Sequence, residues 1–443
     1  MKTLKEVFGL SIALLMLGGI MNTTQAQYKK DLEYYRPVSK DGIYMFTPNK
    51  SQKGIKYNGF KLYIGAGLTS QWQDLTQKTK GIDPTSGQPY SQIWTPIGDG
   101  FNLPTANLDI DAQLAQGMRL HLRTYLSSRH HNEAYVKGGY LRIDAMPMLH
   151  SDLINSLFDY VTIKIGDMEA NYGDAHFLRT DNATALYNPL VGNDLMDSFT
   201  TMDGAEVYVM NSGFIGMIGM AGGMAGEKPT VQNPDSRRPS IYGKLGYDSK
   251  VGANSRIRLT ASLFHSNRYT DLYAGDRAGA RYYNIMADAI PGYGYGGAGD
   301  PHSGRVMPDF SNGFTSFMIN PYVQVNGLHL FGLIESTKEM KTGNDVQQYA
   351  VTGQWFVSPN VYLAARYNVV HGYITAEGNG RPGPAAQSNS TVNRIQVGGG
   401  WFLTTHVLAK VEYVSQKYKH FVQSSVYNGG EFNGLMIEAS IGF

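Results

Sequence analysis

Cysteine is absent from the 443-residue sequence. Disulfide bonds and thiolate metal sites are therefore excluded, and so is a lipid anchor on an amino-terminal cysteine. The folded chain must be held together by apolar burial, hydrogen bonds and ion pairs.

Long apolar runs are also missing beyond the amino terminus. The run at residues 7–20 is shorter than the roughly 20 apolar residues that a membrane-spanning helix needs. It follows the basic start Met1-Lys2-Thr3-Leu4-Lys5 and precedes Thr24-Gln25-Ala26, which is the pattern of a secretory signal peptide. We predict that residues 1–26 are a signal peptide cleaved after Ala26, and that no helix spans a membrane.

A strong net charge is missing as well, because the formal charge is only +2. This balance argues against nucleic-acid binding. Tyrosine and glycine are abundant instead, with 30 and 52 residues. Aromatic strand formers combined with turn glycines, in a secreted chain of this length, predict an all-β protein.

The chain is expected to divide into two parts after the signal peptide. Residues 27–58 are polar and contain Pro37 and Pro48, and we interpret them as an N-terminal periplasmic or lumenal segment. Residues 59–443 are predicted to form about 16 strands, mostly near the 9–11 residues that a tilted membrane strand needs. The candidate strands are 60–72, 105–114, 118–127, 134–144, 158–168, 204–210, 214–222, 240–249, 256–266, 314–325, 328–337, 346–357, 361–371, 392–404, 407–418 and 432–443.

The connections between these strands alternate between two classes. Every second one is a tight turn, and Asn326-Gly327 is a strong two-residue hairpin signal. Most of the others are long: 73–104, 169–202, 223–239, 267–313, 372–391 and 419–431. Connection 145–157, on the short side, is longer and could contain a helical turn. Short turns on one rim and long loops on the other are typical of a transmembrane antiparallel β-barrel with both termini on the short-turn side.

The strands also alternate as a barrel in lipid requires, with apolar side chains outside and polar ones inside. In the last strand, Leu435, Ile437 and Ile441 share one face, and Glu438 and Ser440 share the other. The chain ends on Phe443, and a terminal aromatic residue on such a strand resembles the insertion signal of outer-membrane barrels.

The hairpin 203–222 breaks this rule because Phe214, Ile215, Met217 and Ile218 are apolar on both faces. Either the inserted loop 169–202 or a neighbouring subunit packs against it, or the hairpin has no role beyond local strand packing.

Strands 105–114 and 118–127 carry the sharpest charge pattern. Pairing about Gln116 places Asp109 opposite Arg123 and Asp111 opposite His121. Opposite charges across strands stabilise by roughly 0.2–1 kcal/mol each and would create a field across the pore. They could equally be plain salt bridges of the wall without an effect on selectivity.

The predicted inward-facing charges are mainly basic. A mild anion preference follows, because a narrow wet channel steers ions by its wall charges. The predicted pore-lining residues are Asp109, Asp111, Arg119, His121, Arg123, Lys164, Arg256, Arg258, Arg366 and Arg394. Lys244, Lys410, Glu206, Glu412 and Glu438 are expected to face inward too.

The long connection 169–202 is the predicted constriction loop. Loops of this length in compact domains are usually functional. Its candidate residues are Asp174, His176, Arg179, Asp181, Asp194 and Asp197. These residues are more acidic than the wall and could cancel or reverse its anion preference.

The stretch 109–208 resembles the phosphate-selective porin O/P family. Ile163-Lys164-Ile165-Gly166 leads into Asn171-Tyr172-Gly173, and Asp203-Gly204 opens the next strand. The family usually has Pro-Phe-Gly where this chain has Asn171-Tyr172-Gly173. The resemblance implies a 16-stranded trimeric barrel whose third external loop folds into the lumen, and it implies a transport role. It does not extend to phosphate as the substrate.

The predicted function is that of an outer-membrane porin for passive diffusion of small hydrophilic solutes, in a Gram-negative cell. An adhesin or assembly scaffold acting through its external loops, such as 267–313 with Tyr282-Tyr283, is the alternative; a tyrosine-glycine lid over the mouth is the simpler reading of that loop. We expect no enzyme, because no G-x-S-x-G or H-E-x-x-H motif is present. We expect no cofactor or metal. Expected partners are membrane lipid, lipopolysaccharide, the solutes and two further copies in a homotrimer.

Overall fold

The computed structural model describes residues 30–35, 50, 55–101, 105–127, 134–179, 184–222, 239–267, 270–273, 281–290, 304–308, 310, 313–374 and 387–443. The predicted signal peptide 1–26 lies outside the described residues, and so does Asp181 of the predicted constriction loop.

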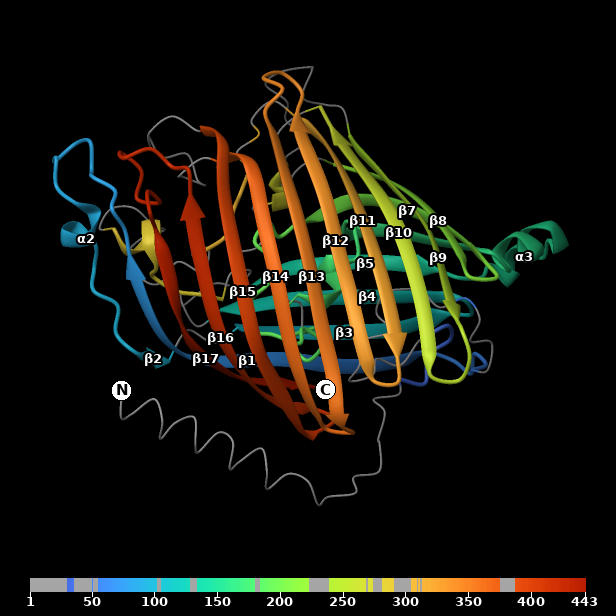
Figure 1. Cartoon of the computed structure of the whole chain (residues 1–443). Helices are drawn as coiled ribbons and strands as arrows, with labels where there is room; N and C mark the ends of the chain where they lie inside the picture. The colour runs from blue at the N-terminus through green and yellow to red at the C-terminus, as the bar shows by residue number, and fades with distance from the viewer. Residues whose placement is uncertain are drawn as a thin grey trace.

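The described chain folds into one closed antiparallel β-barrel (Figure 1). Sixteen long strands form the wall, and β1 closes it by pairing with β3 on one side and β17 on the other. The seventeenth strand, β2 (Gly100–Phe101), is a two-residue addition beside β1 that the sequence did not predict. Closure satisfies every ladder hydrogen bond, which an open sheet in hydrocarbon could not do.

The long strands follow one another around the barrel in chain order. They are β1 (Lys61–Lys78), β3 (Thr105–Ala115), β4 (Met118–Ser127), β5 (Ala134–Ile143), β6 (Val161–Glu169), β7 (Thr201–Asn211), β8 (Phe214–Ala221), β9 (Ser240–Lys250), β10 (Ser255–Ser266), β11 (Phe314–Val325), β12 (Leu328–Glu339), β13 (Asp345–Ser358), β14 (Val361–Ile374), β15 (Gln387–Thr404), β16 (Val407–Lys419) and β17 (Glu431–Gly442).

Helices are short and confined to the connections. Among the described residues, the α-helices are α2 (Tyr90–Ile93) and α3 (Asp152–Phe158), and the 3-10 helices are η3 (Pro147–Leu149), η4 (Ala175–Leu178), η6 (Asp271–Tyr273) and η7 (Met286–Ala289). In the described part of the chain, no helix is long and apolar enough to cross a membrane. The helical turn expected between residues 145 and 157 is confirmed by α3, whose first turn is capped by Ser151.

The two classes of connection are confirmed where the chain is described. The Asn326-Gly327 turn joins β11 to β12 with φ angles of 46° and 85°, the left-handed pair that a type I′ hairpin requires. Several boundaries were predicted wrongly, including the start of β7 at Thr201 and the end of β14 at Ile374. Strand β1 continues to Lys78 because its polar end still pairs with β17, β15 begins at Gln387, and Phe158 belongs to α3.

The alternation of faces is also confirmed. On β14, Leu363 and Tyr367 are 51% and 46% exposed, whereas Arg366 between them is 4% exposed. Glu438 and Ser440 of β17 are buried, and Ile437 and Ile441 face outward. An apolar belt therefore surrounds the barrel, and polar side chains point into its interior.

The hairpin β7–β8 has two apolar faces for two different reasons. Phe214, Ile218 and Met220 face outward and join the apolar belt. Met217 is buried and belongs to the same hydrophobic cluster as Tyr172 from the connection β6–β7. The hypothesis that the inserted loop packs against this hairpin agrees with that cluster.

Candidate functional site

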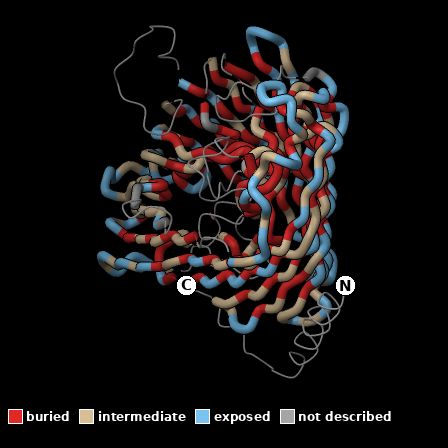
Figure 2. Tube along the Cα trace, turned by 90° about the vertical axis from the view of Figure 1, so that its left-hand side faces the viewer, coloured by how far each residue is buried: buried red, intermediate tan, exposed pale blue. Residues whose placement is uncertain are grey.

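The interior of the barrel is the candidate site, and chain segments fill much of it. Buried segments run inside the ring of strands in Figure 2. The first of them is the connection between β6 and β7, which we call the third loop (170–200). Leu190, Val191, Leu195 and Met196 of this loop are at most 1% exposed. Full burial of each such side chain contributes about 1.5–3 kcal/mol, which favours the inward position.

Polar wall side chains accept hydrogen bonds from the backbone of the third loop. The amide of Val191 donates to Glu412 Oε2 at 2.8 Å, and the amide of Met196 donates to Gln348 Oε1 at 2.8 Å. The amide of Leu195 donates to Asn368 Oδ1. Buried backbone groups need partners, so these wall residues make the inward path of the loop possible.

Basic wall side chains satisfy the carbonyl groups of the same loop. Arg366 Nη1 donates to the carbonyl oxygen of Gly192 at 2.8 Å, and Arg394 Nη1 donates to that of Asn193 at 2.9 Å. Lys410 Nζ donates to the carbonyl oxygen of Ala185 at 3.0 Å. These three cations face inward, as the strand alternation predicts, but they hold the loop in place.

The acidic residues of the third loop are mostly neutralised inside the barrel. Asp174 lies 2.7 Å from Lys244 and accepts a hydrogen bond from Thr260 at 2.8 Å. Burial pushes the pKa of Asp174 upward, but Lys244 and Arg258 outweigh it and hold that pKa below its usual range. Asp197 pairs with Arg179 at 2.6 Å.

Two further loop residues were candidates. Burial raises the pKa of Asp194 above its usual range, although Arg366 opposes this at 3.4 Å. The His176 ring contacts Glu169 at 2.5 Å. Each described acid of the third loop therefore lies beside a basic side chain. These contacts explain how the loop packs, and the prediction that its acids cancel or reverse the anion preference of the wall stays a prediction.

We predict that the Lys244–Asp174 pair anchors the third loop. Lys244→Met should lower the free energy of unfolding by about 3–5 kcal/mol, because it leaves a buried carboxylate without its cation. Urea unfolding of the protein in detergent micelles, followed by tryptophan fluorescence, measures this. The matched control is Lys78→Met, since the Lys78–Glu431 pair is 69% exposed on its lysine side; it should cost less than about 1 kcal/mol. Equal effects of the two variants would contradict the anchoring role.

A second segment also enters the barrel. It comes from the connection between β10 and β11, which we call the fifth loop (267–313, described at 270–273, 281–290, 304–308 and 310). Its Arg281 lies 3.0 Å from Glu438 of β17 and donates to Thr69 at 2.7 Å. Tyr282 donates from its hydroxyl to Glu412 at 2.6 Å.

This placement corrects the prediction that Tyr282-Tyr283 form part of a lid or a sticky outer surface. Tyr282 is fully buried and Tyr283 is 5% exposed, because the wall strands offer polar partners to both residues. Residues 291–303 of the same loop, which include a glycine-tyrosine repeat at 292–296, lie outside the described residues.

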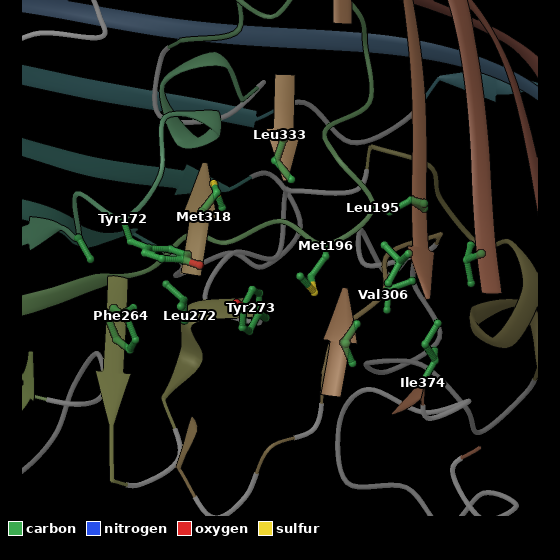
Figure 3. Close-up of a cluster of buried hydrophobic side chains, with 14 of the residues drawn as sticks. Tyr172, Leu195, Met196, Phe264, Leu272, Tyr273, Val306, Met318, Leu333 and Ile374 are labelled. Carbon is green, nitrogen blue, oxygen red and sulfur yellow. The ribbon is translucent and has the colours of Figure 1, made fainter. Parts of the chain in front are cut away.

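The third and fifth loops pack against each other. The amide of Val306 donates to the carbonyl oxygen of Leu195 at 2.8 Å. A Cβ atom placed on Gly192 would lie 2.1 Å from the Tyr282 hydroxyl, so any larger residue there would displace the Tyr282 side chain. Figure 3 shows the hydrophobic cluster that joins them, with Tyr172, Leu195 and Met196 from one loop, Leu272, Tyr273 and Val306 from the other, and Phe264, Met318, Leu333 and Ile374 from the wall.

The inner wall from β9 to β17 is therefore largely covered. The predicted pore-lining residues Arg256, Arg258, Arg366 and Arg394 are between 1% and 9% exposed. Arg256 and Arg258 both pair with Asp248. All four face inward, but the side chains of Arg258 and Arg366 are only 1% and 4% exposed, whereas that of Arg256 is 11% exposed.

The inner wall from β3 to β6 is more accessible and carries the other candidates. The side chains of Arg119, His121, Arg123 and Lys164 retain 11%, 18%, 17% and 14% exposure. Arg142 of β5 belongs with them at 16%, and the sequence analysis missed it. The alternation of Leu141, Arg142 and Ile143 in the predicted strand contained the signal for it.

The basic side chains on the inner wall from β3 to β6 contact acidic side chains. The predicted register is confirmed, with Asp109 opposite Arg123 and Asp111 opposite His121. Arg123 Nε lies 2.6 Å from Asp109, and His121 Nδ1 lies 2.8 Å from Asp111.

In two further pairs the acid is the covered partner. Asp144, 2.8 Å from Arg142, has a side chain that is 1% exposed, and Glu206, 3.2 Å from Lys164, is fully buried. In these two pairs the basic group is the one that remains in contact with the interior, whereas the side chains of Asp109 and Asp111 keep 12% and 13% exposure. We call Arg119, His121, Arg123, Arg142 and Lys164 the basic wall.

The described residues contain no group of three or more histidine, aspartate or glutamate side chains placed to hold a metal ion. The chemistry that this interior offers is ion pairing and hydrogen bonding along its accessible side.

Comparison with known proteins relates the fold to outer-membrane porins. Neither a protein-family model nor a curated protein matches the sequence. Among solved structures, the anion-selective porin from Comamonas acidovorans is similar with a TM-score of 0.50 and 12% identity, over 87% of this chain and 100% of that one.

Two further similar structures are the outer membrane channel DcaP of Acinetobacter baumannii and OmpF of Salmonella typhi in complex with daunomycin. DcaP has a TM-score of 0.49 and 10% identity, over 88% of this chain and 99% of that one. OmpF has a TM-score of 0.48 and 14% identity, over 87% of this chain and 98% of that one. At such identities the likeness concerns the barrel fold.

Proposed function

We propose that the chain is an outer-membrane porin that lets small hydrophilic solutes diffuse passively and prefers anions. The observation that carries this proposal is the asymmetry of the interior. Two loops cover the wall from β9 to β17, whereas the basic wall on β3 to β6 keeps its side chains accessible.

The sign of the preference follows from Coulomb steering. In a narrow wet passage, an ion moves within a few ångströms of the wall, so accessible fixed charges set its local concentration. Arg119, Arg123, Arg142 and Lys164 are accessible, and two of their acidic partners are not. Anions are therefore expected along this wall, and the similar fold of a porin described as anion-selective is consistent with that.

The remaining features of the proposal follow from the barrel. The apolar belt meets membrane lipid and lipopolysaccharide, the short turns and both termini face the periplasm, and the long loops face outward. Residues 1–26 serve as the signal peptide. A homotrimer is the proposed assembly. We also propose that the chain belongs to the phosphate-selective porin O/P family, on the basis of the resemblance over residues 109–208.

Asp174, His176, Arg179, Asp194 and Asp197 are proposed to stiffen the constriction rather than to contact solutes. We propose Asp181 as a further residue of the same constriction loop. The alternative of an adhesin loses part of its support, since Tyr282 and Tyr283 are buried.

The function is tested with the purified, refolded protein in planar lipid bilayers. We expect stepwise increases of current as single channels insert. Heat-denatured protein at the same concentration is the control and should give none. A silent bilayer, with a barrel that still shifts its gel mobility on heating, would contradict the porin proposal and favour the adhesin.

A further inference from the structure

The described part of the N-terminal segment lies against the inner wall near the short-turn rim. Lys30 forms an ion pair with Asp111 of β3. Glu33 Oε2 accepts hydrogen bonds from the amide of Gly117 at 2.7 Å and from Gln113 Nε2 at 3.2 Å. Its own amide donates to Gln113 Oε1 at 3.0 Å. Leu32 between them is fully buried.

More contacts hold this segment from both sides. Lys61 Nζ lies 2.5 Å from Asp31 Oδ2. The Arg119 guanidinium carbon lies 6.0 Å from the centre of the Tyr35 ring. Lys50 donates to the carbonyl oxygen of Asp144 at 2.5 Å and lies 5.1 Å from the centre of the Tyr34 ring.

These contacts place the segment on the accessible side of the interior. Gly117 forms the β3–β4 turn and Asp144 follows β5. Asp111 and Arg119, which belongs to the basic wall, face inward next to those connections. The loops that cover β9 to β17 enter from the other rim.

We propose that residues 30–35 form a lumenal strap at the short-turn mouth of the channel, and that Lys30 is a determinant of ion selectivity through Asp111. The inference rests on the proposed porin function and adds to it an element of the passage that lies outside the barrel strands.

The charges around Asp111 explain why one lysine matters. Its carboxylate faces Lys30, and His121 lies 2.8 Å away on the opposite strand. Arg119 and Arg123 flank His121 on the same face of β4, and Asp109 is already paired with Arg123. With Lys30 removed, Asp111 loses its ammonium partner and adds negative charge to the mouth.

The test compares two single charge-removing variants with the double variant. The reversal potential under a salt gradient at neutral pH is measured for each. Lys30→Gln should shift the reversal potential toward cation selectivity, and Asp111→Asn should shift it toward anion selectivity. The double variant should return to the wild-type value, since it removes one charge of each sign. The control Lys250→Gln removes an exposed charge at the same rim and should leave the potential unchanged. A wild-type potential in Lys30→Gln, or a double variant that keeps the shift of one single variant, would overturn the role of Lys30.

A second measurement does not depend on current. Because the chain has no cysteine, Leu32→Cys introduces a single thiol. In folded protein it should resist a bulky maleimide, whereas Val251→Cys, at a position that is 53% exposed on the same rim, should react rapidly. Rapid labelling of Leu32→Cys would overturn the strap, whatever the bilayer shows. Protection in a protein that gives no current would support the strap and refute the porin function instead.

Discussion

Replacing Arg119 and Arg123 together with glutamate is expected to convert the channel from anion to cation preference. Both side chains lie on the accessible side of the interior, and each replacement changes the wall by two unit charges. One unit charge about 8 Å from a monovalent ion is worth about 0.5 kcal/mol in water. The four units are thus worth roughly 2 kcal/mol, or roughly 30-fold in the permeability ratio, which screening at 0.1 M salt lowers to about fivefold.

The reversal potential of the double variant measures this change. The matched control is Lys250→Glu with Lys341→Glu, because both lysines are exposed on the rims and the change in charge is the same. Arg119→Gln with Arg123→Gln is a gentler variant that should shift the potential half as far in the same direction. If the rim variant moves the potential as much as the wall variant, the basic wall does not set selectivity.

Excision of residues 185–198 is expected to raise the single-channel conductance several-fold. The barrel closes through strand pairing alone, so the wall should survive replacement of this loop by a short glycine-serine linker. Removal also takes away the third-loop carbonyl groups that Arg366, Arg394 and Lys410 contact. The wider channel should therefore prefer anions more strongly than the wild type.

The control for the excision removes residues 84–88, whose side chains are exposed beyond the end of β1. That variant should keep the wild-type conductance. An unchanged conductance after removal of 185–198, in a barrel that still closes, would mean that the third loop does not narrow the passage.

The wall of the barrel was predictable because its signals are local. Asn326-Gly327 determines a turn, and the alternation of Leu363, Arg366 and Tyr367 determines a face, without reference to distant parts of the chain. The register of Asp109 and Asp111 followed from one tight turn. Strand ends were less predictable: β1 continues through polar residues because β17 lies beside it, and that neighbour is more than 350 residues away.

The contents of the barrel were only partly predictable. Strand alternation shows that Arg258 and Arg394 face inward, but it cannot show that another segment covers them. The fifth loop was expected to face solvent because it is rich in tyrosine and glycine, yet Arg281 and Tyr282 find Glu438 and Glu412 inside the barrel. These partners lie far away in the sequence, and the local alternation of polar and apolar residues carries no information about them.

The central claim is that ions pass along the basic wall, and the most direct test measures which side of the interior carries the current. Tyr140 of β5 faces the interior opposite His121, and Ser316 of β11 is fully buried beneath the loops. A charged thiol reagent should react with Tyr140→Cys in an open channel and change its current, while Ser316→Cys keeps its current unaltered. Rapid block of Ser316→Cys, with Tyr140→Cys unaffected, would contradict a passage along the basic wall.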